Sequence, residues 1–302
     1  MGTVTLAESA KLSQDMLVQG VIENIITVNQ MFSALPFQPV DGNALSYNRE
    51  NALGDADVFG VGATITAKNP ATFTKVTSTL TSIIGDAEVN GLIEATRSGV
   101  TNQTAVQVAS KAKSVGRKFQ DMLINGTGAS DEFSGLASLV AGGQSVAAGG
   151  ALTFELLDEL LHKVTDKDGQ VDFIAMSDRE IRQYRALLRA LGGASIGETV
   201  TMPDGSTIMG YGNTPIFRNN WIPTNGGAGT NEASVFAGSF DDGSMTTGIA
   251  GLTATEAAGI MVDGAFTSET KDEKITRVKW YCGLANFSEK GLAALTGVIP
   301  PA

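Results

Sequence analysis

The chain has 302 residues and a net charge of −11, and only 18% of its residues are charged, against roughly one quarter in ordinary soluble domains. The acidic balance argues against tight binding of nucleic acid, which depends mainly on Lys and Arg that neutralise phosphates. Cys282 is the only cysteine, which excludes an intrachain disulfide and a thiolate metal cluster within one chain.

Hydrophobic residues make up 42% of the chain, enough for a packed core in a protein of this length. No apolar run approaches the ~20 residues that span a membrane, and the N-terminus lacks the pattern of a signal peptide. We therefore expect synthesis in a reducing cytoplasm and no membrane partner.

Residues 3–33 are predicted to form a helix, because apolar residues recur at spacings of three and four. These residues are Leu17, Val21, Ile25, Val28 and Phe32. A segment at a chain end is ordered only when it docks on another surface. We interpret this one as an arm that packs on its own domain or on a neighbour.

Residues 49–82 are rich in Thr, Val, Ala and Gly and poor in large apolar side chains. Residues 72–81 alternate with a period of two, and Asn69-Pro70 is a turn signal near the middle of the segment. This pattern predicts a long two-stranded ribbon. Because an isolated hairpin is marginal in water, the ribbon needs support from another surface.

Residues 101–124 give the clearest helical pattern of the chain. Its apolar face is formed by Ala105, Val108, Ala112, Val115, Phe119 and Met122. Asn125-Gly126 provides a stop signal, and the helix would be about 36 Å long. We interpret it as a structural spine, because the Ala-rich face is too short to favour a coiled coil.

The middle of the chain is predicted to be an α/β layer with helices packed on a sheet. A glycine- and alanine-rich stretch at 141–151 is expected to be a linker or surface loop. Helix 154–165, strand 171–176 and helix 178–191 follow, and Ser177 and Glu180 have capping-box spacing at the start of the last helix. Leu191 is expected to face inward.

The C-terminal third is predicted to be rich in strands. A hairpin turn at 202–206 separates Val200 from Ile208. Residues 252–262 and 274–284 are expected to pair with each other, and residues 289–302 form a short apolar tail.

A search for catalytic chemistry finds no set of residues that would support it. His162 is the only histidine, lies off the apolar stripe of its helix, and has no Gly-x-Ser-x-Gly elbow to work with. Asp166, Asp168 and Asp172 lack the glycine and glutamate positions of a calcium loop. Cys282 is expected to be a buried, inert thiol. We therefore predict no enzyme and no catalytic, cofactor-binding or metal-binding residues.

Six charged residues flank the ribbon or lie within it. They are Arg49, Glu50, Asp55, Asp57, Lys68 and Lys75. One interpretation is that they are solvated edge charges that discourage wrong strand pairing. The other is that they form salt bridges between subunits, which makes them candidates for inter-subunit contacts.

The order of the elements resembles that of the major capsid proteins of tailed phages, which have the Hong Kong 97-type fold. The resemblance covers nearly the whole chain, and its motifs are loose. They are Asn125-Gly126-Thr127-Gly128, Phe133-Ser134-Gly135-Leu136 and Thr276-Arg277-Val278-Lys279-Trp280-Tyr281. It implies an α+β fold with an N-terminal arm, an extended β-hairpin loop (E-loop), a peripheral domain with a long spine helix and an α/β axial domain.

The resemblance also implies a division of the chain. The arm would span 1–33, the peripheral domain 34–48, 86–132 and 246–288, the E-loop 49–85, and the axial domain 133–245. In one interpretation the tail, 289–302, returns to the axial domain. The family's Lys–Asn cross-links would involve Lys68 or Lys75 by location only, since no catalytic carboxylate pattern accompanies them.

The implied function is structural. The chain would assemble into hexamers and pentamers of an icosahedral or prolate head that encloses double-stranded DNA without sequence-specific binding. Separate scaffold and portal proteins, and decoration proteins in some heads, would be its partners, and it would enter the virion after assembly in the host cytoplasm. The alternatives are an encapsulin-like shell protein, a phage tail or surface protein, and a hydrolase that uses His162.

Overall fold

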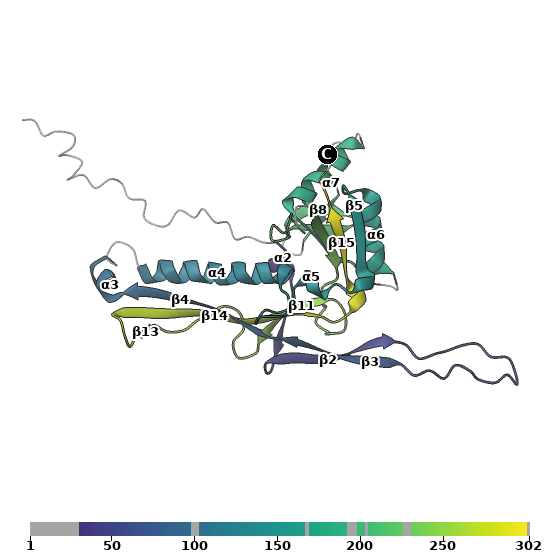
Figure 1. The fold of residues 1–302 in the computed structure, drawn as a ribbon, viewed down its shortest axis with the longest axis horizontal. Helices are drawn as coiled ribbons and strands as arrows, with labels where there is room; N and C mark the ends of the chain where they lie inside the picture. The colour runs from purple at the N-terminus through teal and green to yellow at the C-terminus, as the bar shows by residue number, and fades with distance from the viewer. Residues whose placement is uncertain are drawn as a thin grey trace, which may run out of the picture. The chain divides into compact units, whose positions relative to one another are not determined.

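The computed structural model describes residues 30–97, 103–166, 169–191, 198–202, 205–225 and 231–300. Of the predicted helix 3–33 only the end lies in these ranges, as α2 (Gln30–Ala34). The fold is α+β, with a six-stranded, a seven-stranded and a two-stranded sheet (Figure 1). The described residues divide into a smaller compact unit, formed by 85–97, 103–114 and 262–278, and a larger unit formed by the rest.

The six-stranded sheet is organised around the long strand β14 (Glu273–Asn286). Its strands follow the order β1-β11-β14-β12, and β4 and β13 also pair with β14. The bounds of these strands are Phe37–Val40 for β1, Thr81–Asn90 for β4, Ile249–Ala254 for β11, Met261–Val262 for β12 and Phe266–Thr267 for β13. Strand β1 is parallel to β11, and β11 is antiparallel to β14.

The predicted pairing of 252–262 with 274–284 is confirmed at both ends of the segment, with Leu252 of β11 opposite Gly283 and with β12 also paired to β14. The strand ends earlier than expected, because the chain turns after Ala254, where Ala257 donates its amide to the Ala254 carbonyl. The predicted alternation holds in the first part of β14, where Thr276, Val278, Trp280 and Cys282 are buried, and every residue from Cys282 to Asn286 is buried.

The smaller unit contains the second half of β4, α3 (Gly91–Arg97), the first half of α4 (Gln103–Asn125), β13 and the first half of β14. Its strands bring Asp86 and Arg277 together in a two-pronged ion pair, with both N···O distances at 2.8 Å. The Arg277 guanidinium also lies over the ring of Phe266. The Arg277 guanidinium holds the pKa of the Asp86 carboxyl below its usual value.

The seven-stranded sheet lies in the larger unit, with the order β5-β15-β10-β6-β9-β8-β7. The bounds of its strands are Ser145–Gly150 for β5, Phe173–Met176 for β6, Thr199–Thr201 for β7, Thr207–Tyr211 for β8, Thr214–Arg218 for β9, Ala233–Gly238 for β10 and Leu292–Val298 for β15. The helices α6 (Phe154–Thr165) and α7 (Asp178–Ala190) share one core with this sheet. The predicted hairpin is confirmed, since Val200 pairs with Ile208.

The loop predicted at 141–151 is wrong. A short 3₁₀ turn, Gly142–Gln144, leads into β5, which pairs in parallel with β15. Its small side chains have weak strand propensity, so the strand forms because a partner about 150 residues away in the sequence supplies the hydrogen bonds. β15 itself lies between β5 and β10, inside the sheet.

The second half of the predicted spine helix carries the larger unit's aromatic core. In α4 the side chains of Val115, Phe119 and Met122 are buried as predicted, whereas Ala105 near the start is exposed. Phe119 and Trp280 of β14 lie 4.5 Å apart between ring centroids. Phe32, Phe37 and Phe133 also pack against Phe119.

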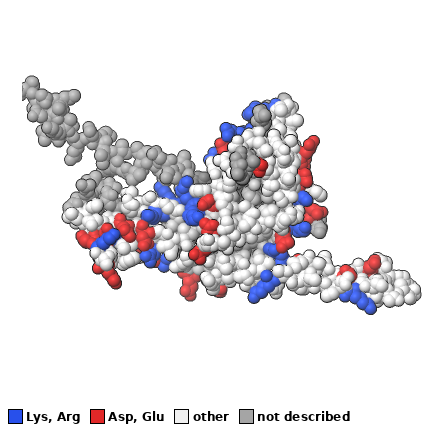
Figure 2. All heavy atoms as spheres, viewed as in Figure 1, with Lys and Arg blue, Asp and Glu red and all other residues white. Residues whose placement is uncertain are grey.

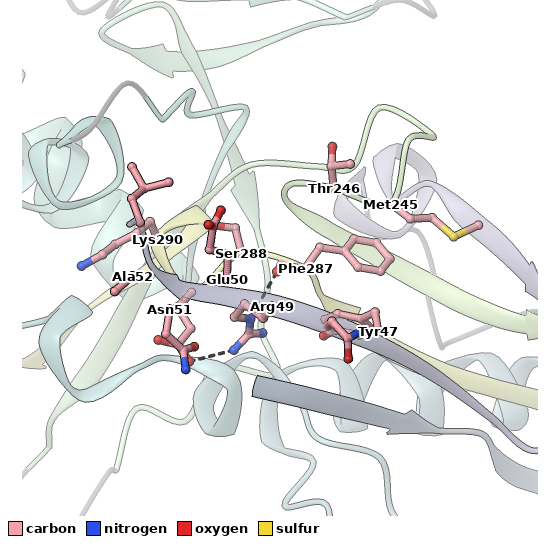
Figure 3. Close-up of a pocket in the computed structure, with 13 residues that line it drawn as sticks. Tyr47, Arg49, Glu50, Asn51, Ala52, Met245, Thr246, Phe287, Ser288 and Lys290 are labelled. Atoms are coloured by element: carbon pink, nitrogen blue, oxygen red, sulfur yellow. Dashed lines mark hydrogen bonds and ion pairs between the residues drawn. The ribbon is translucent and has the colours of Figure 1, made fainter. Parts of the chain in front are cut away.

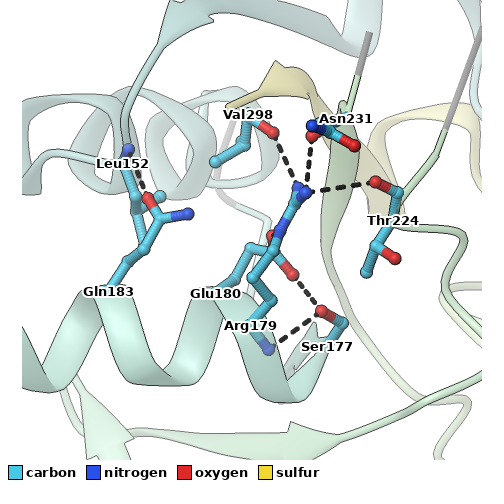
Figure 4. A network of polar contacts seen from close by, with 8 residues as sticks. All are labelled: Leu152, Ser177, Arg179, Glu180, Gln183, Thr224, Asn231 and Val298. Atoms are coloured by element: carbon cyan, nitrogen blue, oxygen red, sulfur yellow. Dashed lines mark hydrogen bonds and ion pairs between the residues drawn. The ribbon is translucent and has the colours of Figure 1, made fainter. Parts of the chain in front are cut away.

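Helix α7 begins as predicted, and its start is joined to the C-terminal strand. The Ser177 hydroxyl accepts the Arg179 amide and donates to the fully buried Glu180. The guanidinium of Arg179 donates to the carbonyl oxygen of Val298 at 2.9 Å and to those of residues 224 and 231 (Figure 4). The end of the helix differs from the prediction, because Leu191 is 72% exposed.

Candidate functional site

The predicted ribbon is present, formed by β2 (Ala44–Ala52) and β3 (Thr72–Thr79). The two strands are antiparallel, from Ala44 opposite Thr79 to Ala52 opposite Thr72. The pairing starts five residues earlier than the sequence predicted. Residues 53–71 connect the strands and contain no further strand.

The turn of this connection is not at Asn69-Pro70, so that prediction is wrong. The chain reverses at 60–63, where Ala63 donates to the Gly60 carbonyl at 3.0 Å. Gly62 has φ +85° there, a conformation that favours glycine. Asn69 lies between this turn and β3, and its carbonyl oxygen accepts the backbone amide of Asp55. Pro70, which has no amide proton to donate, therefore lies beside the paired strands and not in the turn.

The ribbon and its connection expose apolar side chains that no core covers. Val58 is 95% exposed and Phe73 of β3 is 64% exposed. Leu53, Val61 and Ile65 are also exposed. A run of exposed large apolar side chains on an unsupported ribbon marks a surface that meets another protein.

Arg49 fixes the root of the ribbon to the end of β14. Its guanidinium donates to the carbonyl oxygens of Asn286 at 2.6 Å and Phe287 at 3.2 Å, and it pairs with Glu289 at 2.7 Å. The Tyr47 hydroxyl also donates to the Asn286 carbonyl at 2.7 Å. Figure 3 shows Tyr47 and Arg49 of β2 beside Phe287.

A half-open hollow of about 790 Å³ lies at this root. Residues 47–53 of the ribbon, residues 245–246 and residues 287–290 line it (Figure 3). Its lining mixes aromatic rings with the charges of Glu50 and Lys290, and no group of three His, Cys, Asp or Glu that could hold a metal occurs anywhere in the described part of the chain.

The six predicted contact residues do not form one cluster. Arg49 has its partners within the chain, as above. The Asp55 carboxylate accepts a hydrogen bond from the side-chain amide of Asn69, and the Asp57 carboxylate accepts the backbone amide of Val58 at 2.7 Å.

Glu50, Lys68 and Lys75 are exposed and have no ion-pair partner among the residues that the structure describes. Sequence reasoning missed Glu289 as the partner of Arg49, since the two residues are 240 positions apart and no motif connects them.

The residues considered for chemistry lie as expected where the structure describes them. His162 is exposed on α6. Cys282 is fully buried, and burial raises the pKa of its thiol to about 12. Asp168 lies outside the described residues, and Asp172 serves the fold by accepting the Phe240 amide at 2.9 Å. Among the helices that the structure describes, none is both long and apolar enough to cross a membrane.

The loop after the spine helix brings two backbone segments unusually close. Gly126 donates its amide to the Met122 carbonyl at 2.9 Å, and Gly135 donates to the Gly126 carbonyl at 2.8 Å. A Cβ on Gly135 would lie 2.7 Å from the Gly126 nitrogen. Close packing of the backbone therefore requires glycine at both positions 126 and 135, which belong to two of the motifs that carry the family resemblance. The short helix α5 (Leu136–Leu139) follows with Leu136 fully buried.

A protein-family model matches the chain from the connection of the ribbon onward. The model of the SU10 major capsid protein family matches residues 54–241, more than half of the chain. The chain belongs to this family. It is therefore a major capsid protein, and the fold expected from the resemblance is confirmed.

Solved structures of shell proteins agree with this family in fold over nearly the whole chain. The SrpI encapsulin of Synechococcus elongatus PCC 7942 superposes with a TM-score of 0.78 at 19% identity, covering 99% of this chain and 98% of the other. The capsid of a native GTA particle gives 0.73 at 11% identity, with 99% of each chain covered. The capsid of Myoviridae phage XM1 gives 0.67 at 14% identity, covering 99% and 100%. No curated protein sequence matches the chain.

Proposed function

We propose that this major capsid protein forms the shell of a phage head as hexamers and pentamers around double-stranded DNA. One observation carries the proposal. The connection between the two ribbon strands exposes Val58, Val61 and Ile65 and has no core of its own, in a chain of a capsid family. Such a ribbon gains support when it lies across a neighbouring copy, where main-chain pairing adds to apolar contact.

We assign the parts of the shell subunit along the boundaries predicted from the sequence. Residues 1–33 are the arm and 49–85 the E-loop. The peripheral domain is 34–48, 86–132 and 246–288, and the axial domain is 133–245. The position of β15 between β5 and β10 supports the return of the tail, 289–302, to the axial domain.

The contact residues of the ribbon are proposed to act between copies. Glu50, Lys68 and Lys75 are exposed and unpaired with other described residues, so their charges are available to a neighbour. Asp55 and Asp57 shape the connection, and Arg49 orients the root. Since exposed ion pairs contribute little to stability, these charges would select the register of the contact more than its strength.

The other partners follow from the same proposal. Scaffold, portal and, in some heads, decoration proteins assemble with the chain in the host cytoplasm, and the subunit then resides in the virion. Because its net charge is −11, we expect the shell to enclose DNA without binding it tightly. We assign the chain no catalytic role, because its single histidine is exposed and its single thiol is buried.

The ribbon contact can be tested without disturbing the core. In one variant Val58→Ser is combined with Val61→Ser, and the matched control combines Thr64→Ser with Thr66→Ser in the same exposed connection. We expect the first variant to melt like wild type but to form few shells, and the control to assemble normally. Normal assembly of the first variant would overturn the proposal. Loss of its fold would show that the ribbon belongs to the core.

An encapsulin-like compartment is the second candidate, because SrpI superposes with a higher TM-score than the GTA and XM1 capsids cited above. At 19% identity this likeness shows the fold alone. The contents of particles purified from the native source separate the two functions. Double-stranded DNA of uniform length supports the phage head, and a single protein cargo without DNA supports the compartment.

A further inference from the structure

Two helices of the larger unit carry exposed charges of opposite sign along their outer faces. The acidic stripe of α6 consists of Glu155, Asp158 and Glu159. The basic stripe of α7 consists of Arg182, Arg185 and Arg189. Figure 2 shows acidic side chains gathered over α6 and basic side chains gathered over α7.

Both stripes face away from the core that the helices share. Helix α6 buries Leu157, Leu160 and Val164, and at about 100° per residue the acidic positions fall on the opposite side of the helix. In the same way Ile181 and Tyr184 of α7 face the core while its arginines face out. At the ~1.5 Å rise per residue, the acidic stripe is about 6 Å long and the basic stripe about 10 Å long, so the two can overlap over about 6 Å.

No ion pair within the described chain neutralises either stripe, although the exposed Asp178 lies on the same face of α7 as the three arginines. The three arginines and the carboxylates of Glu155 and Glu159 form no ion pair among the residues that the structure describes. Asp158 alone has a polar partner, since it accepts a hydrogen bond from the Tyr211 hydroxyl.

Local helix physics accounts for only part of this arrangement, since Lys163 follows Glu159 and Arg182 follows Asp178 by four positions, a spacing at which opposite charges attract. Glu155–Glu159 and Arg185–Arg189 are like charges four positions apart, a spacing at which they repel. The helix dipole favours an acid in the first turn and a base in the last turn, which explains Glu155 and Arg189. It does not explain Glu159 or Arg185, which lie farther inside their helices.

We propose that the acidic stripe of α6 in one copy binds the basic stripe of α7 in the next copy. The inference rests on the proposed shell function and deepens it by naming the contact surfaces. Because the two surfaces differ, the contact is head-to-tail, the type of contact that builds a ring when the rotation between neighbouring copies divides a full turn. Opposite charges across such a contact set its register and speed the encounter between copies.

Nucleic acid is the competing ligand for three arginines on one helix face. The acidic stripe argues for the second copy, since it supplies a surface of opposite charge in the same chain. A chain with net charge −11 also repels a polyanion as a whole. The experiment below separates the two.

Three variants test the contact. The first reverses the basic stripe with Arg182→Glu and Arg185→Glu, and the second reverses the acidic stripe with Glu155→Lys and Glu159→Lys. The third combines all four changes. Asp158 is left intact because of its bond to Tyr211. Arg218→Glu is the control, an exposed arginine of the same unit outside both stripes.

We expect each single-stripe variant to fold but to yield at least roughly tenfold fewer shells than wild type, because like charges then face each other. The combined variant should recover assembly, and the control should assemble normally. Normal assembly of either single-stripe variant, or failure of the combined variant to recover, overturns the proposal. Normal assembly of the first variant with loss of bound DNA would assign the arginines to nucleic acid.

A mixture of the first and second variants shows whether a failure to assemble is caused by misfolding or by repulsion between like charges. The first variant is acidic on both helices and the second is basic on both, so the two can alternate around an even-numbered ring. We expect the mixture to form hexamers that neither protein forms alone, as seen by negative-stain microscopy. Absence of hexamers in the mixture counts against the proposal. Wild type run in parallel reports separately on the shell function.

Discussion

Gly135 donates its amide proton to the carbonyl oxygen of Gly126 over 2.8 Å, and the surrounding backbone leaves no room for a side chain at either glycine. A Cβ on Gly126 would lie 2.6 Å from the Met122 carbonyl oxygen. This contact turns the chain out of the spine helix and into the loop that leads to the seven-stranded sheet.

Gly126→Ala and Gly135→Ala should each lower the free energy of unfolding by about 3 kcal/mol, the upper end for overpacking, because the clashing backbone atoms cannot rotate away. Gly116→Ala is the matched control, since open space surrounds a Cβ there. It lies inside α4, so alanine should raise stability by about 0.5–1 kcal/mol. Urea unfolding of the unassembled chain measures all three. Equal effects at the three positions would contradict the close-packing argument.

Arg49 should matter more to stability than its ion-pair partner. Hydrogen bonds from a charged donor to carbonyl oxygens contribute about 1.5–3 kcal/mol, and Arg49 makes them to Asn286 and Phe287. Glu289 is 53% exposed, so Glu289→Gln should cost under about 1 kcal/mol. We expect Arg49→Met to cost roughly 2–3 kcal/mol in urea unfolding. A larger loss for Glu289→Gln would show that the ion pair dominates the root.

Acid should weaken the chain through Asp86. Its folded pKa is depressed by Arg277 below the usual 3.8. The pair therefore stabilises the chain fully above that value, and its contribution is lost as the pH falls through the lower folded pKa. Stability of wild type and Asp86→Asn, measured by urea unfolding from pH 7 to pH 2, should differ at neutral pH and converge at the acid end. A constant difference across this range would contradict the assignment.

Cys282 should be unreactive in the folded chain. It is fully buried, and its pKa of about 12 leaves almost no thiolate at neutral pH. A thiol reagent at pH 8 should label it only after denaturant unfolds the chain, which a colorimetric assay follows directly. Rapid labelling of the native chain would show that β14 opens or that the thiol is accessible.

The sequence predicted the elements whose signals are local. The helices with apolar stripes, the cap at Ser177 and the alternation along β14 all depend on residues within one or two turns or strands. It failed where a distant partner decides the structure. The strand β5 needs β15, and Arg49 needs carbonyl groups almost 240 residues away. The turn at Gly62 was missed because Asn69-Pro70 is a stronger local signal. Leu191 was assigned inward from its spacing, although α7 ends before it.

The candidate site was predicted in part for the same reason. Composition indicated a ribbon that needs a neighbour, and the exposed side chains of the ribbon agree with it. The charges of the ribbon could be named, but their partners could not, since no pattern within one chain specifies contacts with a second copy. The opposed stripes of α6 and α7 became visible only when the core side of each helix was known.

Assembly of the full chain tests the central claim most directly. The chain is expressed alone and together with the scaffold protein proposed above, and the products are examined by negative-stain electron microscopy and sedimentation. A subunit of a phage head should form rings or closed shells in at least one of these conditions. A monomer that persists in both conditions would contradict the account.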